Sequence, residues 1–307
     1  MMLAPGEIVG PFAVESLLGR GAAATVWAVR RRDGGGVYAL KVLSTALPTG
    51  AARLRLEAQE LLSMRHPNVV SVTDVVEVNG HLALVMERVH GPSLDRLLAR
   101  EVLDWLMIDR LFAQVLDGVE AAHARALVHR DLKPSNVLVA ESGGLRVAKV
   151  SDFGLVKALH AALGPLSLTQ PFEALGTPGY VAPEQMIDAT SVDQRADIFS
   201  LGCILYRMAA GRTAFPGDLR GAVVASLRGE YKPLEQAAPG APATYAAAVR
   251  ACLSPGRDQR PPTVAALRAM LSLPGGAPAV ASPPPSAEPE TLGLGDIAAA
   301  LGGDDEL

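Results

Sequence analysis

Short runs of alternating apolar and polar residues fill the chain from Gly10 to about Val89. Runs rich in β-branched residues occupy 12–15, 25–29 and 37–42, and two further runs flank Asn79-Gly80. Asn-Gly between such runs is a strong signal for the tight turn of a β-hairpin. This part of the chain is therefore predicted to form a small antiparallel sheet.

One helix is predicted to interrupt this sheet. Leu54, Leu61 and Leu62 share one side of a helical repeat, and Glu57 lies one turn from Leu54 and Leu61. After Gly91 the helical repeat dominates. Over roughly four turns, apolar residues recur at helical spacing: Ile108, Leu111, Phe112, Val115, Leu116, Val119 and Ala122.

Further helices are predicted in the second half of the chain. They are expected at about 192–210 with Gly211 as the C-cap, at 242–253, and at 262–272, where Pro261-Pro262 suits a first turn. The second half is therefore expected to be mostly helical. A small β-rich lobe would precede a larger helical lobe, which is an α+β arrangement.

The composition changes near the end of the chain. Residues 274–290 are rich in Pro, Gly, Ser and Glu, and such a segment cannot bury enough apolar surface to fold, so a linker is expected. A short tail, 291–307, carries apolar residues at 294, 297, 298 and 301 ahead of Asp304-Asp305-Glu306. This tail is either a docking helix for a partner groove or a disordered acidic end.

Composition and charge exclude some classes of function. The chain has 307 residues, of which 49% are hydrophobic, enough for a sizeable core. Its net charge of −4 and its pI near 5.9 offer no basic surface for nucleic acid. Nucleic acid is therefore not expected as a partner.

The two cysteines, Cys203 and Cys252, lie in apolar helical patterns without the close spacing of a metal site or disulfide framework. We interpret them as small buried hydrophobic residues. The N-terminus lacks the basic and apolar regions of a signal peptide, and no stretch is apolar enough to span a membrane. The cytoplasm is the expected compartment.

Small residues separate the first two predicted strands, in the segment 18–26. Gly19 and Gly21 would let the backbone close over phosphate groups without side-chain clashes, although a simple hairpin turn would also explain them. Ala24 stands where the usual phosphate-covering pattern has a third glycine. The loop alone is weak evidence for nucleotide binding.

Lys41 has apolar strand residues on both sides, and Ala39 lies on the same face of the predicted sheet. A lysine that faces inward needs an anionic partner. Glu57, on the predicted helix, could supply it. The alternatives are a solvated lysine on an edge strand and a surface glutamate.

The strongest chemical signal is the string His-Arg-Asp-Leu-Lys-Pro-Ser-Asn at 129–136, followed by Asp152-Phe153-Gly154. Phosphoryl transfer needs a positioned acceptor, metal on the phosphate oxygens, and positive charge where negative charge develops. Asp131 can accept the hydroxyl proton, and Lys133 can meet the γ-phosphate. Asn136 and Asp152 offer the oxygen ligands that Mg²⁺ prefers, with Mn²⁺ as an alternative ion.

Together these strings resemble the eukaryotic-type (Hanks-type) Ser/Thr protein kinases of bacteria, over about residues 10–273. The roles given above follow that family's signature set. The resemblance implies ATP and protein substrates, and a bilobal α+β fold. Its small β-rich N-lobe, with one main helix, would span about 10–89, and its larger, mostly helical C-lobe about 91–273.

The resemblance also assigns an adenine pocket. The segment 86–91 resembles the hinge whose backbone groups hold adenine, with Met86 as gatekeeper and Glu87 and Val89 as hinge residues. Leu138 would form the floor of this pocket. Two N-lobe residues would form its roof: Val26 and Ala39.

The segment 176–184 resembles the end of a kinase activation segment. In that family its glutamate, Glu184 here, pairs with a distant arginine, and Arg260 occupies the matching place. Asp197 matches the family's aspartate on a buried helix that anchors the catalytic loop. Lys133 and Thr177 both favour serine and threonine over tyrosine as acceptors.

Arg130 marks the class of kinases commonly regulated by phosphorylation of the activation segment, because an arginine beside the catalytic acid can be held by a phosphate. Ser167 and Thr169 are the candidates for modification. Thr177 is expected to be structural and to face the substrate. A segment ordered without modification is the alternative.

Two other functions remain open. A pseudokinase scaffold would keep the fold for binding alone, but it predicts the loss of key residues that are all present here. A small-molecule phosphotransferase shares the Asp131 and Asn136 chemistry but would lack the 176–184 segment that docks a peptide.

Overall fold

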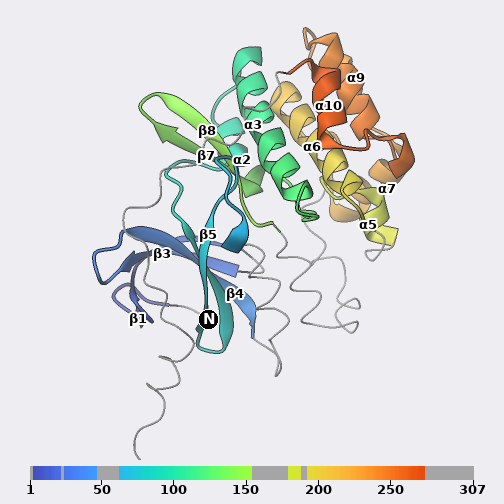
Figure 1. The fold of residues 1–307 in the computed structure, drawn as a ribbon. Coiled ribbons are helices and arrows are strands. Elements are labelled where there is room, and N and C mark those ends of the chain that lie inside the picture. The colour runs from blue at the N-terminus through green and yellow to red at the C-terminus, as the bar shows by residue number, and fades with distance from the viewer. Residues whose placement is uncertain (1–2, 22–23, 47–61, 154–178, 188–191, 274–307) are drawn as a thin grey trace, which may run out of the picture.

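A sheet at one end and a group of helices at the other form the described part of the chain, which is residues 3–21, 24–46, 62–153, 179–187 and 192–273 of a computed structural model (Figure 1). The sheet is antiparallel and has six strands in the order β1-β2-β3-β4-β6-β5. Their bounds are β1 Ile8–Val9, β2 Phe12–Arg20, β3 Ala24–Arg31, β4 Val37–Ala46, β5 Val72–Val78 and β6 His81–Glu87.

Alternation along the strands divides the sheet into two faces with different cores. On β4, Leu40 and Val42 belong to a small core together with Phe12 and Trp27. Ala39 points the other way, into the large core that the helices complete. Because side chains alternate along a strand, Lys41 shares the face of Ala39 and is directed toward the helical part.

The predicted hairpin at Asn79-Gly80 is present and joins β5 to β6. Both turn residues have positive φ, 49° for Asn79 and 78° for Gly80. Asn and Gly adopt this conformation most easily, and it matches the twist of the flanking strands. The turn therefore sets the register in which β6 pairs with β5.

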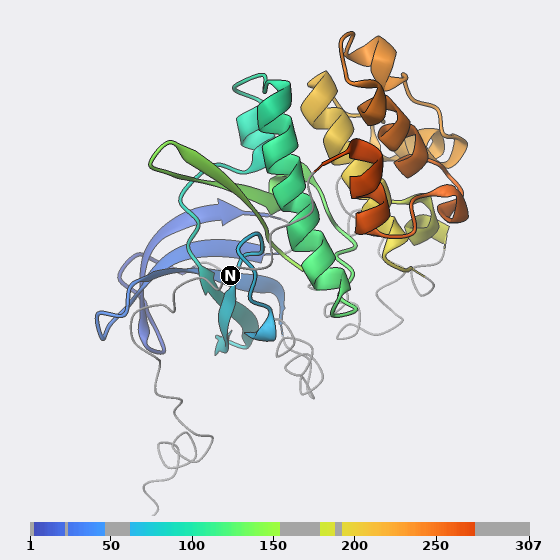
Figure 2. The same ribbon diagram turned by 45° about the horizontal axis from the view of Figure 1, so that its top comes forward.

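The remaining described elements follow β6. They are α2 Leu94–Leu98, α3 Trp105–His123, η1 Pro134–Asn136, β7 Val137–Ser142, β8 Leu145–Val150, α5 Pro183–Ile187, α6 Arg195–Ala210, α7 Leu219–Arg228, α8 Leu234–Ala237, α9 Ala243–Cys252, η3 Arg257–Gln259 and α10 Val264–Leu271. Figure 2 shows the long helix α3 between the sheet and the other large helices.

The predicted helices of the second half are found, with small shifts. All seven apolar residues predicted for α3 are buried, and Gly211 ends α6 in the left-handed conformation at φ 68°. The prediction that Pro261-Pro262 form a first turn was wrong. Thr263 is the N-cap of α10 and its hydroxyl accepts from Ala266 N, so the prolines precede the helix.

Other sequence predictions have mixed outcomes. Cys203 and Cys252 are buried and free, as expected. The hairpin of β7 and β8 was not predicted, although it lies between the string at 129–136 and Asp152. Most of the predicted N-lobe helix, the linker 274–290 and the tail 291–307 lie outside the described residues.

The sheet and the helical part are joined by close backbone contacts. A Cβ on Gly91 would lie 1.8 Å from the carbonyl oxygen of Val139, so only glycine lets the chain after β6 approach β7. A Cβ on Gly118 of α3 would lie 2.4 Å from the carbonyl oxygen of Asn68. Asn68 in turn accepts from Val150 N at 2.8 Å. These contacts fix the position of β7 and β8 against both parts.

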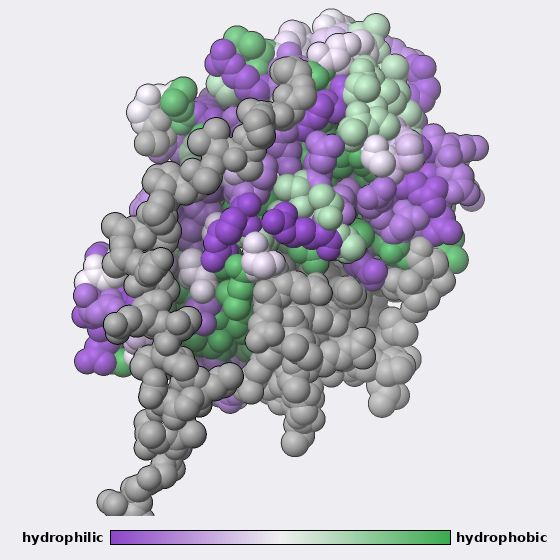
Figure 3. All heavy atoms as spheres, in the orientation of Figure 1, coloured by the Kyte–Doolittle hydropathy of each residue, from purple (hydrophilic) through white to green (hydrophobic). Residues whose placement is uncertain are grey.

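Hydrophilic and apolar residues are intermixed on the face that Figure 3 shows. None of the helices in the described ranges is long and apolar enough to cross a membrane.

Candidate active site

Asp197, in the first turn of α6, is fully buried and holds the predicted catalytic loop by its backbone. Its carboxylate accepts from His129 N at 2.8 Å and from Arg130 N at 2.9 Å. It also accepts from the ring nitrogen Nε2 of His123 at 2.7 Å. A buried carboxylate needs such donors, because burial without partners is costly.

These donors keep Asp197 ionised. Burial alone would raise its pKa, but the hydrogen bonds from His123 and from the backbone N–H of His129 outweigh burial and lower the pKa. Arg130 has φ 67°, an unfavourable conformation for a residue other than glycine. The bond to Asp197 stabilises this conformation.

Asp131 follows directly and is held by its neighbours. Lys133 Nζ contacts both of its carboxylate oxygens, at 3.0 and 2.8 Å. Asn136 Nδ2 donates to the carbonyl oxygen of Asp131 at 2.8 Å. The short helix η1 brings Asn136 back toward Asp131, so that side chains on both sides of the turn contact Asp131.

His129 connects this loop to the strand that leads to Asp152. Its Nε2 donates to the carbonyl oxygen of Ser151 at 2.8 Å, and its Nδ1 accepts from Asp131 N at 3.3 Å. Ser151 N and Oγ both donate to the carbonyl oxygen of Asn136. The ring of His129 also packs against Phe153, with centroids 4.8 Å apart.

Lys41 reaches from β4 of the sheet to Asp152, with 2.7 Å between Nζ and Oδ1. Burial would raise the pKa of Asp152, but the charge and hydrogen bond of Lys41 dominate and lower it. Asp152 has φ 69°. The expected partner of Lys41, Glu57, lies outside the described residues, and the ion pair with Asp152 was not predicted.

The predicted adenine pocket is assembled from neighbouring strands. Ala39 pairs with Met86 across β4 and β6, while Val26 pairs with Lys41 across β3 and β4. Leu138, on β7, packs against the same large core as Ala39 and Met86. The structure thus places Ala39 beside Met86 and Val26 beside Lys41, while Leu138 contacts the large core that Ala39 and Met86 also join.

Behind Met86 lies a small apolar cavity of about 20 Å³, room for about one water. Its lining residues come from the sheet, the segment before β5 and the end of β8: Met64, Val69, Val70, Val72, Leu84, Met86, Asp152 and Phe153. Seven of these residues are apolar, and Asp152 is the one charged member of the lining.

The side chain of Glu87 has a role that the sequence did not suggest. It forms an ion pair with Lys149 of β8 at 2.9 and 3.0 Å and accepts from Ser71 N at 2.9 Å. Its backbone N–H donates to the carbonyl oxygen of Ser71 at 2.9 Å, so its carbonyl is the group left for the predicted contact with adenine. The ion pair ties the end of β6 to β8.

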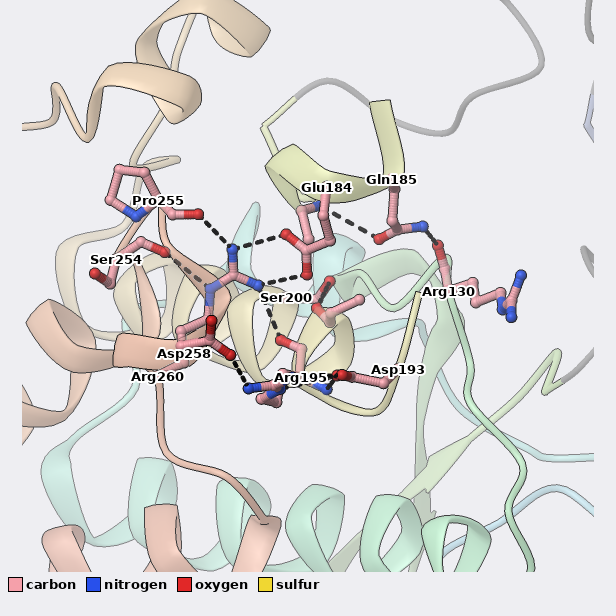
Figure 4. Close-up of polar contacts among 12 residues, drawn as sticks. Arg130, Glu184, Gln185, Asp193, Arg195, Ser200, Ser254, Pro255, Asp258 and Arg260 are labelled. Carbon is pink, nitrogen blue, oxygen red and sulfur yellow. Dashed lines mark hydrogen bonds and ion pairs between the residues drawn. The ribbon is translucent and has the colours of Figure 1, made fainter. Parts of the chain in front are cut away.

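The predicted pair of Glu184 and Arg260 is formed, with two contacts of 2.8 Å (Figure 4). The guanidinium is fully buried, and its other donors reach the carbonyl oxygens of Ser254, Pro255 and Arg195. All five of its N–H groups are thus satisfied. This cluster fixes α5, the short helix that begins within the predicted end of the activation segment.

Several predicted residues fall outside the described ranges: Glu57, Ser167, Thr169 and Thr177. Of the described ones, Gly19 lies in β2 and Gly21 follows it, while Val89 follows β6. The sequence reading missed three side chains of the site: His123, Lys149 and Gln185. His123 follows the last apolar residue of the α3 pattern, and this position was the only feature of the sequence that pointed to it.

We predict that Asp197→Asn destabilises the fold and does so in a pH-dependent way. An amide offers one acceptor oxygen for three donors, so the free energy of unfolding should fall by about 2–4 kcal/mol near neutral pH. Because the pKa of Asp197 is lowered from 3.8 in the folded protein, the stabilisation is complete above that value and is lost as the pH falls below it.

Urea unfolding of both proteins between neutral pH and about pH 3 measures this effect. The difference between wild type and variant should shrink as the pH drops. A difference that stays constant across the range would contradict the assignment of an ionised Asp197.

Comparison with known proteins agrees with this geometry. Residues 12–268 match the family described as Protein kinase domain. The Ser/Thr protein kinase PkaA of Streptomyces coelicolor is 37% identical over 221 residues, 67% of this chain and 40% of the relative. The Ser/Thr protein kinase pkn2 of Myxococcus xanthus is 36% identical over 244 residues, 78% of this chain and 29% of the relative. The chain thus spans less than half the length of these two relatives.

Solved structures share the fold. The kinase domain of Mycobacterium tuberculosis PknI matches with a TM-score of 0.67 at 23% identity, covering 89% of this chain and 99% of that domain. Rad53 in complex with AMP-PNP matches with a TM-score of 0.70 at 25% identity, covering 85% of this chain and 65% of that one. The predicted fold class is confirmed. The chain belongs to the protein kinase family, and bacterial Ser/Thr protein kinases are among its relatives.

Proposed function

We propose that this chain is an active kinase that transfers the γ-phosphoryl group of ATP to serine or threonine in protein substrates. The observation that carries the proposal is the arrangement around Asp131. Its carboxylate contacts Lys133, its backbone is held by Asn136, and Asp152, two residues after β8, is paired with Lys41. Such a set of groups fits phosphoryl transfer better than binding alone.

Nucleotide binding is supported on the sheet side of the site. Ala39, Met86 and Leu138 offer apolar surface for adenine, and the backbone after Glu87 offers hydrogen-bonding groups. An added Cβ on Gly19 would meet no described atom within 4 Å, so no described part of the chain requires glycine there. A phosphate group that approaches the backbone would require it. Rad53, a structural relative, was solved with the nucleotide analogue AMP-PNP.

The transfer step follows from the residues of the loop. The acceptor hydroxyl forms a bond to the γ-phosphorus as the bond from that phosphorus to the bridging oxygen of ADP breaks. Asp131 orients the hydroxyl and takes its proton. Lys133 and Lys41 supply positive charge where the phosphate oxygens gain negative charge. The pairs that these lysines form now would give way to contacts with the nucleotide.

A divalent metal fits the donor set at the end of β8. Asn136 and Asp152 provide amide and carboxylate oxygens, and Mg²⁺ is typically bound by one or two carboxylates together with substrate phosphates. The low pKa of Asp152 keeps its carboxylate ionised for such a role. A bound Mg²⁺ or Mn²⁺ would neutralise phosphate charge. We also propose that the reaction takes place in the cytoplasm, where ATP is available.

We predict that Asp131→Asn lowers kcat for phosphate transfer to a generic protein substrate by about 10²–10⁴-fold, the usual contribution of a positioned proton acceptor. ATP affinity should change little, because Asp131 is not part of the adenine pocket. Steady-state kinetics and nucleotide titration measure the two quantities separately. A pseudokinase scaffold predicts no transfer by the wild type either.

Asp104→Asn is the matched control. Asp104 is the N-cap of α3 and accepts from Met107 N, and asparagine caps a helix about as well as aspartate. This variant should keep both kcat and ATP affinity. An Asp131→Asn protein with wild-type kcat would rule out the proposed role of Asp131.

We also propose that phosphorylation of the activation segment regulates the enzyme. The support is Arg130, whose side chain is next to Asp131 in the sequence and whose backbone conformation is fixed by Asp197. A phosphate on Ser167 or Thr169 could pair with this guanidinium and order the segment beside the site.

Mass spectrometry of wild type incubated with ATP and Mg²⁺ should detect phosphate within residues 155–177, and the combined Ser167→Ala and Thr169→Ala substitutions should lower kcat about tenfold or more. The Asp131→Asn protein is the control and should carry no phosphate after the same incubation. A segment free of phosphate in a fully active wild type would refute this mode of regulation.

A further inference from the structure

Gln185 links the end of the activation segment to the catalytic loop. It lies on α5, next to Glu184, and its side chain points toward the loop (Figure 4). Its Nε2 donates to the carbonyl oxygen of Arg130 at 2.7 Å, and its Oε1 accepts from Ala182 N at 3.3 Å. The two partners fix the orientation of the amide, because one can only accept and the other can only donate.

The bond to Arg130 acts on a single peptide unit. The carbonyl of Arg130 and the N–H of Asp131 belong to the same planar group, so the two cannot rotate independently. Gln185 holds the carbonyl end, and Nδ1 of His129 holds the N–H end at 3.3 Å. This unit joins Arg130, with φ 67°, to the proposed proton acceptor. A rotation of the unit would redirect the carboxylate of Asp131.

The other end of the link is rigid. Glu184 is held by the fully buried guanidinium of Arg260, so the backbone of α5 is fixed one residue before Gln185. Ser200 Oγ also donates to the carbonyl oxygen of Tyr180 at 2.8 Å, which ties the residues before α5 to α6. Gln185 therefore transmits the position of α5 to the catalytic loop.

We propose that Gln185 is a positioning residue for Asp131, through which the placement of α5 sets the orientation of the proton acceptor. This inference rests on the proposed kinase function. It differs from the pairing of Glu184 with Arg260, which holds α5 to the helical lobe without touching the loop. The residue pattern at 176–184 did not indicate a role for the neighbouring Gln185.

The test uses Gln185→Glu, which keeps the size of the side chain and the acceptor for Ala182 N but loses the donor to Arg130. At neutral pH the new carboxylate faces a carbonyl oxygen, and kcat should fall about tenfold with little change in KM for ATP. When the carboxyl is protonated, it can donate again. The ratio of the variant's kcat to that of wild type should therefore rise from about pH 8 to about pH 5.

The charged groups near this position are common to both proteins. They are Glu184 with Arg260, Arg130, Asp131 with Lys133, and His129, whose Nδ1 accepts from Asp131 N; Asp197 accepts from Arg130 N. Their own titrations cancel in the ratio of the two kcat values. A purely structural role of Gln185 would lower kcat and thermal stability together and would give a ratio that does not depend on pH.

Gln194→Glu is the matched control. Gln194 Nε2 donates to the carbonyl oxygen of Pro262 at 2.8 Å, a similar bond in the same lobe but without contact to the catalytic loop. This variant should keep kcat within about twofold of wild type at every pH. Gln185→Leu, which cannot donate at any pH, should lower kcat without recovery in acid.

Hydrogen exchange separates this inference from the proposed function. In Gln185→Leu the amides of Arg130 and Asp131 should exchange faster than in wild type, whether or not the protein transfers phosphate. An inactive wild type with this change in exchange would refute the kinase proposal alone. Unchanged exchange, or a Gln185→Glu protein with wild-type kcat across the pH range, would overturn the positioning role.

Discussion

The fully buried carboxylate of Asp197 is the interaction on which the rest of the site depends. It supplies the acceptors for two consecutive backbone N–H groups, those of His129 and Arg130, and so stabilises a left-handed residue directly before Asp131. Without that constraint the loop would relax to a more favourable backbone conformation. The neighbouring contacts of Lys133, Asn136 and Gln185 then act on a loop whose course is already fixed.

A second set of contacts holds the sheet against this loop. Lys41 crosses from β4 to Asp152, Glu87 pairs with Lys149, and Asn68 bonds to the backbone of β8. All three meet at the β7 and β8 hairpin or directly after it. This hairpin therefore supports both the residues predicted to hold adenine and the loop that carries Asp131.

Contiguous patterns in the sequence predicted much of the fold and many of the site residues. The strands of the sheet, the buried face of α3 and the Asn79-Gly80 turn follow from local periodicity and turn chemistry, which tertiary contacts here reinforce. The start of α10 was misplaced because Thr263 caps the helix better than the prolines before it begin one. The β7 and β8 hairpin was missed although Gly143-Gly144, with φ 57° and 78°, is a turn signal of the same kind as Asn79-Gly80.

The three side chains that were not predicted were missed for a different reason. His123, Lys149 and Gln185 each bond to a partner more than 50 residues away, and a single sequence carries no sign of such pairings. A glutamine next to a glutamate on a short helix is typical of positions that face the solvent. Their roles follow only once the chain is folded and the carbonyl, carboxylate or backbone group that each one meets is known.

The most direct test of the account is to follow the phosphate from ATP labelled at the γ-position into peptides that differ only in one acceptor residue. The account predicts that the label appears as an ester on the serine and threonine peptides and is nearly absent from the tyrosine peptide. Label that is released only as inorganic phosphate, or that remains in ATP, would contradict the assignment of Asp131 and its neighbours to protein phosphorylation.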